Sequence, residues 1–205
     1  MAGMSIWEII GTVLGIVGVW LMIRQNIWGW PVGLVQVAVY AWVFLGAKLY
    51  SDAILQVFFF AIQAYGWWHW RQGNGARATP PADGSRSGVA APPVLPVTRL
   101  PPVAVAGWVA LGAAAAVGWG AFMHRTTDAA LPWWDAFILV FSLIAQWLQA
   151  RKHLENWAGW MIVNTVAIGV YWAKDLRLTS GLYAVFFGLA VAGHLAWRRT
   201  MKAAA

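Results

Sequence analysis

The chain contains no cysteine, and only 10% of its 205 residues are charged. The missing thiols exclude disulfide frameworks, cysteine nucleophiles and cysteine-based zinc or iron–sulfur sites. Soluble domains carry roughly 25% charged residues, so seven acids and fourteen bases are too few to cover a water-soluble monomer of this size. Hydrophobic residues make up 61% of the chain, which also holds 17 tryptophans. This composition indicates an integral membrane protein.

Seven apolar stretches are long enough to cross a bilayer as helices, at about 20 residues for each span. They cover residues 5–23, 28–47, 51–70, 103–123, 133–150, 157–173 and 178–197. The segment between the third and fourth stretches holds seven of the nine prolines, which predicts a flexible linker. The predicted organisation is a first three-helix bundle over 1–70, a cytoplasmic Pro/Gly-rich linker over 71–102, a joining transmembrane helix over 103–123, and a second three-helix bundle with a short cytoplasmic tail over 124–205.

Basic residues are distributed unevenly between the two sets of connections. One set holds ten, namely Arg24, Arg71, Arg77, Arg86, Arg99, Arg151, Lys152, Arg198, Arg199 and Lys202. The other set holds four, namely Lys48, Arg125, Lys174 and Arg177. Because cytoplasmic loops are enriched in Lys and Arg, we expect the N-terminus outside and the linker and C-terminus inside. This orientation also accounts for the net charge of +7 without a nucleic-acid partner.

The second and sixth stretches open on similar tryptophan patterns, which suggests an internal duplication. Trp30 and Trp42 match Trp160 and Trp172 at an offset of 130, and the triplet Ser51, Phe58 and Phe59 matches Thr179, Phe186 and Phe187 at an offset of 128. These matches predict an all-α membrane fold of seven transmembrane helices, arranged as two parallel three-helix repeats joined by a linker helix (3+1+3). Parallel repeats with a binding site between them are typical of transporters.

Ionisable side chains are almost absent from the middle of the predicted spans. Asp52, Asp135, Glu155 and Asp175 all lie near span ends, whereas proton relays and metal sites in membranes need such groups at depth. We therefore expect no metal, no cofactor and no catalytic residue. An intramembrane enzyme would need a nucleophile beside a base, and Ser142 has no histidine that can be placed beside it. The chain also lacks the GxxxxGK[ST] loop that an ATP-driven pump requires.

Amide and aromatic side chains recur together at mid-span. The candidate substrate-binding residues are Gln56, Phe59, Gln63 and Trp67 in the third stretch, Trp160 and Asn164 in the sixth, and Tyr183 in the seventh. Amides hydrogen-bond neutral hydroxyls and carbonyls, and indole faces attract cationic groups. Together these residues predict a pocket for a small molecule with a flat ring, including a cationic one.

Each of these residues also has a purely structural interpretation. Amides can bridge transmembrane helices, and we assign that role to Gln36 and Gln146. Tryptophan gathers at bilayer interfaces, so a structural subunit would carry aromatics only at the two membrane edges. Phe59, Phe60 and Trp42 fall deeper than that on the predicted boundaries, which favours a binding pocket.

Several motifs, in this order along the chain, resemble one known family. They are Asn26–Pro31 (NIWGWP), Leu49–Ala53 (LYSDA), Tyr65–Trp70 (the pattern YGWxxW), Asn156–Trp160 (the pattern NWxxW, preceded by Arg151 and Lys152) and Lys174–Tyr183 (similar to KxLxxTSxLY). Together they resemble the PnuC family of bacterial vitamin transporters, and they cover both predicted bundles.

The resemblance implies more than the residues show by themselves. It implies a fold similar to the SWEET sugar transporters, a homotrimer in the bacterial inner membrane, and a substrate site inside each protomer. It also implies facilitated diffusion of nicotinamide riboside, an NAD precursor trapped inside by phosphorylation. Gln63 and Asn164 stand where nicotinamide riboside carriers often have Asn and Asp, so thiamine or riboflavin is the alternative substrate.

Overall fold

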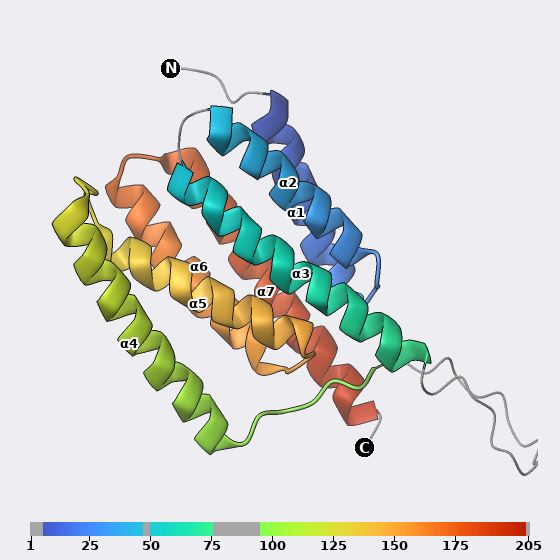
Figure 1. The fold of residues 1–205 in the computed structure, drawn as a ribbon. Coiled ribbons are helices and arrows are strands. Elements are labelled where there is room, and N and C mark those ends of the chain that lie inside the picture. The colour runs from blue at the N-terminus through green and yellow to red at the C-terminus, as the bar shows by residue number, and fades with distance from the viewer. Residues whose placement is uncertain (1–5, 47–49, 76–94, 204–205) are drawn as a thin grey trace, which may run out of the picture.

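The computed structural model describes residues 6–46, 50–75 and 95–203, which form seven α-helices (Figure 1). These are α1 (Ile6–Ile23), α2 (Gly29–Gly46), α3 (Tyr50–Gly75), α4 (Pro102–Thr126), α5 (Pro132–Ala150), α6 (Glu155–Ala173) and α7 (Arg177–Ala203). Apart from one isolated β-bridge between Thr98 and His153, the described residues contain no β-structure. The predicted all-α class is therefore confirmed.

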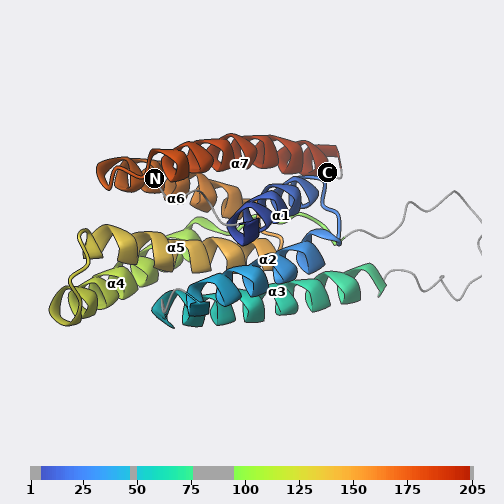
Figure 2. The same ribbon diagram turned by 90° about the horizontal axis from the view of Figure 1, so that it is seen from above.

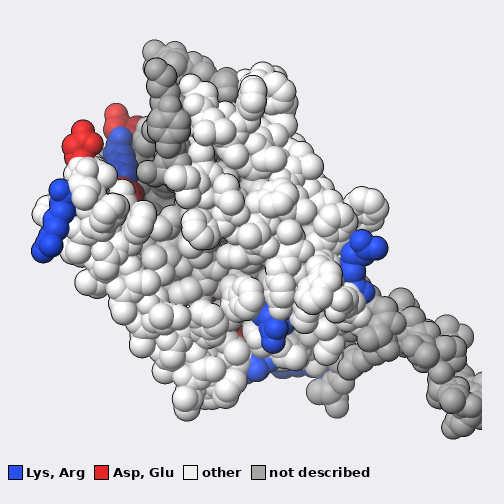
Figure 3. Space-filling view, in the orientation of Figure 1, with Lys and Arg blue, Asp and Glu red and all other residues white. Residues whose placement is uncertain are grey.

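Five of the helices, α1, α2, α4, α5 and α7, are long and apolar enough to cross a membrane. The other two, α3 and α6, are as long but not among these five, and they carry the amides and tryptophans of the predicted pocket. Charged side chains lie toward the ends of the face drawn in Figure 3, and a broad uncharged surface separates them. The chain is thus a multi-pass membrane protein in which α3 and α6 bring polar groups among apolar helices.

Six helices pack in a closed ring in the order α1, α2, α3, α5, α6, α7 and back to α1. We refer to α1–α3 as the first triplet and to α5–α7 as the second triplet. Helix α4 lies outside the ring and packs only against α5 among the described helices (Figure 2). Its contact face carries the small residues Gly112, Ala116 and Gly120, which let α5 approach closely.

The two triplets run in the same direction through the molecule. Helices α3 and α7 finish at the same end, where α5 turns into α6, while α1 begins at the opposite end (Figure 1). We call the end where α3 and α7 finish the linker end, since the chain between α3 and α4 begins and finishes there. We call the end where α1 begins the far end.

The turn from α1 into α2 recurs in the turn from α5 into α6, at an offset of 127 residues. Five backbone N–H to carbonyl hydrogen bonds recur in both turns. In the first turn they are Arg24–Trp20, Gln25–Met22, Asn26–Leu21, Gly29–Asn26 and Trp30–Ile27. In the second turn, in the same order, they are Arg151–Trp147, Lys152–Gln149, His153–Leu148, Asn156–His153 and Trp157–Leu154. Gln25 and Lys152 both adopt left-handed backbone angles, with φ of 54° and 60°. In the structure the counterpart of Trp30 is therefore Trp157, and the predicted match of Trp30 with Trp160 is out of register.

Four buried tryptophans form a continuous row across the linker end, which we call the tryptophan row. Trp30 meets Trp70 edge-on with ring centroids 5.4 Å apart, and Trp157 meets Trp197 in the same way at 5.4 Å. Trp70 and Trp197 complete the row with centroids 6.1 Å apart. All four side chains are at most 1% exposed. The row joins the first triplet to the second through packed indole rings.

Two reciprocal hydrogen bonds fasten the tryptophan row. The Trp70 indole N–H of the first triplet donates to the Ala150 carbonyl at the end of α5, at 3.1 Å. The Trp197 indole N–H of the second triplet donates to the Met22 carbonyl near the end of α1, at 3.0 Å. Each triplet thus holds the other at a helix C-terminus, where carbonyl groups have no partner within the helix.

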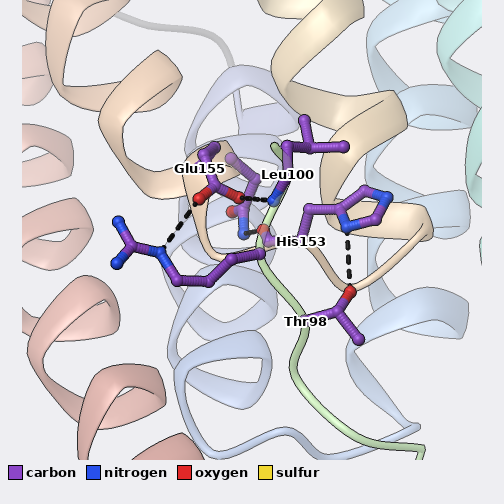
Figure 4. Close-up of polar contacts among 6 residues, drawn as sticks. Thr98, Leu100, His153 and Glu155 are labelled. Atoms are coloured by element: carbon purple, nitrogen blue, oxygen red, sulfur yellow. Dashed lines mark hydrogen bonds and ion pairs between the residues drawn. The ribbon is translucent and has the colours of Figure 1, made fainter. Parts of the chain in front are cut away.

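The chain from 95 to 101 lies along the α5–α6 turn at the linker end (Figure 4). The Leu154 N–H donates to the Thr98 carbonyl at 2.9 Å, and the Thr98 hydroxyl lies 2.9 Å from His153 Nδ1. The Leu100 N–H donates to a Glu155 carboxylate oxygen at 3.1 Å. These bonds attach the end of the predicted linker to the second triplet.

The predicted linker over 71–102 therefore differs from the structure at both ends. Helix α3 continues to Gly75, and Val97 is buried in the core beside the tryptophan row. Proline and glycine content indicates loop structure, but it carries no information about bonds to residues 55 positions away in the chain. The middle of the predicted linker, 76–94, lies outside the described residues.

Lys152 is buried in this region, with 1% of the residue exposed. Its ammonium group lies 4.5 Å from the Trp70 ring centroid, so the indole face partly compensates the charge. Burial lowers the pKa of Lys152 to about 8. Since Lys152 is the counterpart of Gln25, the second triplet carries a cation where the first carries a neutral amide.

Removing either reciprocal bond should lower stability. We expect Trp70→Phe to cost about 1–3 kcal/mol, because it leaves the buried Ala150 carbonyl without its indole donor. We expect Trp197→Phe to cost about 0.5–1.5 kcal/mol, because the Met22 carbonyl keeps its bond from the Gln25 N–H. The apparent melting temperature of the protein in detergent measures this loss. Trp42→Phe, at a position that is 70% exposed, is the matched control and should change stability by less than about 0.5 kcal/mol. Equal melting temperatures for the three variants would contradict the role given to the two bonds.

Stability should rise with pH between about 8 and 10.5, the folded and ordinary pKa values of Lys152. In that window the folded protein has released the proton while the unfolded chain still holds it, and such a difference stabilises the folded state as pH rises. We expect Lys152→Gln, which installs the residue found at the matching position, to lack this rise. Melting temperatures measured from pH 7 to 10 test the prediction, and identical pH profiles for the two proteins would refute it.

Candidate functional site

Gln63 lies in the ring of helices, seven residues before Trp70 on α3, which places it about 10 Å inward from the tryptophan row. The residue is 7% exposed, and its amide rests directly on Gly33 of α2, where any Cβ atom would collide with it. The absence of a side chain at Gly33 is therefore what lets a polar amide reach between α2 and α3.

Asn164 lies one helical turn after Trp160 on α6, as the spacing of the two residues in the sequence predicts. Asn164 is 4% exposed, and the Trp160 indole N–H donates to Gln149 Oε1 of α5 at 2.9 Å. Gln149 is itself 6% exposed. The sequence analysis did not select Gln149, and its only signal there is that it lies three residues after Gln146 on the same face of α5.

These three residues lie at neighbouring depths in the molecule. Trp160 stands at the position that matches Gly33, and Gln63 rests on Gly33. Asn164 lies one turn farther from the linker end. We call Gln63, Trp160 and Asn164 the inner polar layer. Two amides and an indole, without an ionised side chain among them, can bind hydroxyl or carbonyl groups and stack on a flat ring.

The predicted residues Gln56, Phe59 and Tyr183 lie in a second layer, closer to the far end. Gln56 is seven residues from Gln63 along α3, or about 10 Å. Tyr183 stacks on Tyr171 with ring centroids 5.1 Å apart. Gln56 and Phe59 are half-buried. The structure thus divides the predicted site residues between two depths.

Trp67 is half-buried and packs against the core cluster around the tryptophan row. It also lines a surface hollow of about 410 Å³ together with Ala64, Trp68, Arg71 and Gln72. The Arg71 guanidinium carbon lies 5.8 Å from the Trp67 ring centroid. The four-residue spacing places Gln63 and Trp67 on the same side of α3. In the structure Gln63 contacts α2, whereas Trp67 also reaches the surface hollow.

The electrostatics of the inner polar layer are those of a neutral site. The ion pair between Lys174 and Asp135, with an N–O distance of 2.8 Å, lies at the far end, and the pair between Arg99 and Glu155, at 3.3 Å, lies at the linker end. Within the described ranges, no three or more His, Asp or Glu side chains gather where they could hold a metal ion. The chemistry available at this depth is hydrogen bonding and aromatic stacking.

Comparison with known proteins gives consistent matches along the chain. A family model described as nicotinamide mononucleotide transporter matches residues 5–199. The nicotinamide riboside transporter PnuC of Escherichia coli K12 is 28% identical over 200 residues, which cover 93% of this chain and 84% of that protein. The riboflavin/roseoflavin transporter RibM of Streptomyces davaonensis is 30% identical over 203 residues, which cover 94% and 84%.

A solved structure shares the fold. The crystal structure of the vitamin B3 transporter PnuC matches with a TM-score of 0.71 and 24% identity, over 94% of this chain and 80% of that one. This likeness concerns the arrangement of helices, while the sequence matches span nearly the whole chain. The protein therefore belongs to the nicotinamide mononucleotide transporter family.

Proposed function

We propose that the protein carries a vitamin with a flat heteroaromatic ring across the membrane by facilitated diffusion, with nicotinamide riboside as the first candidate. The observation that carries the proposal is the inner polar layer, which offers one indole and two buried amides and no ionised group. A neutral or cationic ring with hydroxyl substituents suits such groups. The named relatives, one for nicotinamide riboside and one for riboflavin, support both substrates. Thiamine is a further alternative, and phosphorylation inside the cell would make uptake one-way.

The proposed architecture is a 3+1+3 arrangement of seven spans, in two parallel repeats. The recurrence of the α1–α2 turn in the α5–α6 turn supports the duplication. The accumulation of Arg and Lys at the linker end supports a cytoplasmic position for that end and an external N-terminus. The bacterial inner membrane and a homotrimer follow from resemblance to the family.

The proposed mechanism follows from where the two triplets touch. The tryptophan row and its two reciprocal bonds close the linker end below the inner polar layer. A substrate in this layer would reach the cytoplasm only after the triplets separate at that end. Rocking of one triplet against the other at that end would break the two reciprocal bonds, the Arg151–Tyr65 and Gln25–Thr200 hydrogen bonds, and the Trp70–Trp197 and Tyr65–Trp147 ring contacts. In the proposed mechanism thermal motion drives this exchange without ATP.

Uptake into proteoliposomes tests the function. We expect purified protein to admit labelled nicotinamide riboside saturably, without an ion gradient or ATP, until the concentrations on both sides are equal. Gln63→Ala and Asn164→Ala should each lower kcat/KM about tenfold, because each removes a hydrogen bond in a buried site. Thr165→Ala, at the exposed neighbour of Asn164, is the control and should transport as the wild type does.

The substrate is settled in the same assay by offering labelled thiamine and riboflavin. Entry of one of these in place of nicotinamide riboside would replace the first candidate and leave passive vitamin transport standing. Entry of none of the three, with a correctly folded protein, would refute the proposed function.

Gly33→Ala tests the placement of Gln63 without altering its chemistry. Alanine is a better helix former than glycine, so the change in stability should stay within about 1 kcal/mol. The new Cβ atom occupies the place of the Gln63 amide and must displace it. We expect an increase in the KM for uptake similar to that of Gln63→Ala, and an unchanged KM would show that the amide does not act from this position.

A further inference from the structure

We propose that Gln149 is a positioning residue of the substrate site: it fixes the Trp160 ring as the aromatic wall of the inner polar layer. The inference rests on the proposed function, since it assigns a role toward the same substrate. The bond that carries it is the one from the Trp160 indole N–H to Gln149 Oε1, at 2.9 Å. Gln149 is 6% exposed, so water does not compete freely for the indole N–H.

One hydrogen bond is enough to select the orientation of this ring. The outer torsion of a tryptophan side chain is broad, and the Trp160 ring is half-buried at the edge of the core cluster, whereas Trp157 is fully enclosed in it. A buried indole N–H without an acceptor is unfavourable. The orientation that reaches Gln149 is therefore preferred over the other rotations of the ring.

The matching positions in the first triplet show that the bond is not part of the common scaffold. At the offset of 127 residues, Met22 matches Gln149 and Gly33 matches Trp160. The first triplet thus lacks both the acceptor and the indole, and its Met22 side chain packs against Gly29 instead. The fold of a triplet is compatible with methionine at this position, so the amide in the second triplet serves something other than folding.

The same comparison explains the Gln63 amide. Gln63 fills the space that Gly33 leaves open, and the residue matching Gln63 in the second triplet is Ala190, which is buried with 2% exposed. The first triplet therefore contributes an amide at this depth, and the second contributes an indole and the Asn164 amide. Only the second triplet offers a ring, so a substrate would place its flat ring toward α6 in one preferred orientation.

A double-mutant cycle tests the proposal. The variants are Gln149→Met, Trp160→Phe and their combination, and the readout is the Kd for whichever of nicotinamide riboside, thiamine or riboflavin the wild type transports. We expect Gln149→Met to weaken binding about three- to tenfold in the wild-type background, as the loss of one hydrogen bond does. In the Trp160→Phe background, where the donor is already absent, the same substitution should have no further effect.

Two controls separate positioning from a general structural effect. Gln146→Met removes another buried amide from the same helix and should leave Kd within twofold of the wild type. Gln149→Met should raise the KM for transport with little change in the maximal rate, and should leave the melting temperature close to that of Gln146→Met.

The outcomes distinguish the two claims. Equal weakening by Gln149→Met in both backgrounds, or no weakening in either, would overturn the positioning role while vitamin transport stands. A wild-type protein that neither binds nor transports any of the three vitamins would refute the proposed function, and the role of Gln149 with it.

Discussion

The two reciprocal bonds from indole N–H groups to helix-end carbonyls are the contacts on which the rest of the structure depends. Trp70 and Trp197 each reach from the last turns of one triplet to the end of the first helix of the other. Inside a bilayer no water is available to hydrogen-bond the indole N–H and carbonyl groups in their place, so the two bonds hold the triplets at a defined distance and close the ring. The α5–α6 turn, the buried Lys152 and the segment from 95 to 101 all pack onto the surface that this closure creates.

The sequence predicts the helices well because their signal is local, whereas the register of the duplication depends on packing. Tryptophan is so frequent that Trp30 finds a plausible match in Trp160, although an ungapped offset of 127 also aligns Arg24 with Arg151, Gly66 with Gly193 and Trp70 with Trp197. Of the predicted site residues, Gln63, Trp160 and Asn164 lie at neighbouring depths, while Trp67 faces a surface hollow. Gln149 was missed because an amide in a span does not reveal which indole it will bond.

Departures from the internal symmetry include the residues of the inner polar layer. The turns, the tryptophan row and the glycines that accommodate it, Gly66 and Gly193, are shared by both triplets. The pairs that differ include Gly33 with Trp160, Gln63 with Ala190 and Met22 with Gln149. The tryptophan contacts near the linker end are shared by both triplets even though side chains beside them, such as Met22 and Gln149, differ.

Helix α4 touches only α5, and no helix of the first triplet depends on it among the described contacts. It carries the chain from the linker end back to the far end, so that α5 begins on the side where α1 begins (Figure 1). Two separate three-helix chains, inserted in the same direction, would need no such element to associate. In the proposed 3+1+3 arrangement, α4 is the element that allows both triplets to run in the same direction within one polypeptide, and the small residues on its face pack it closely against α5.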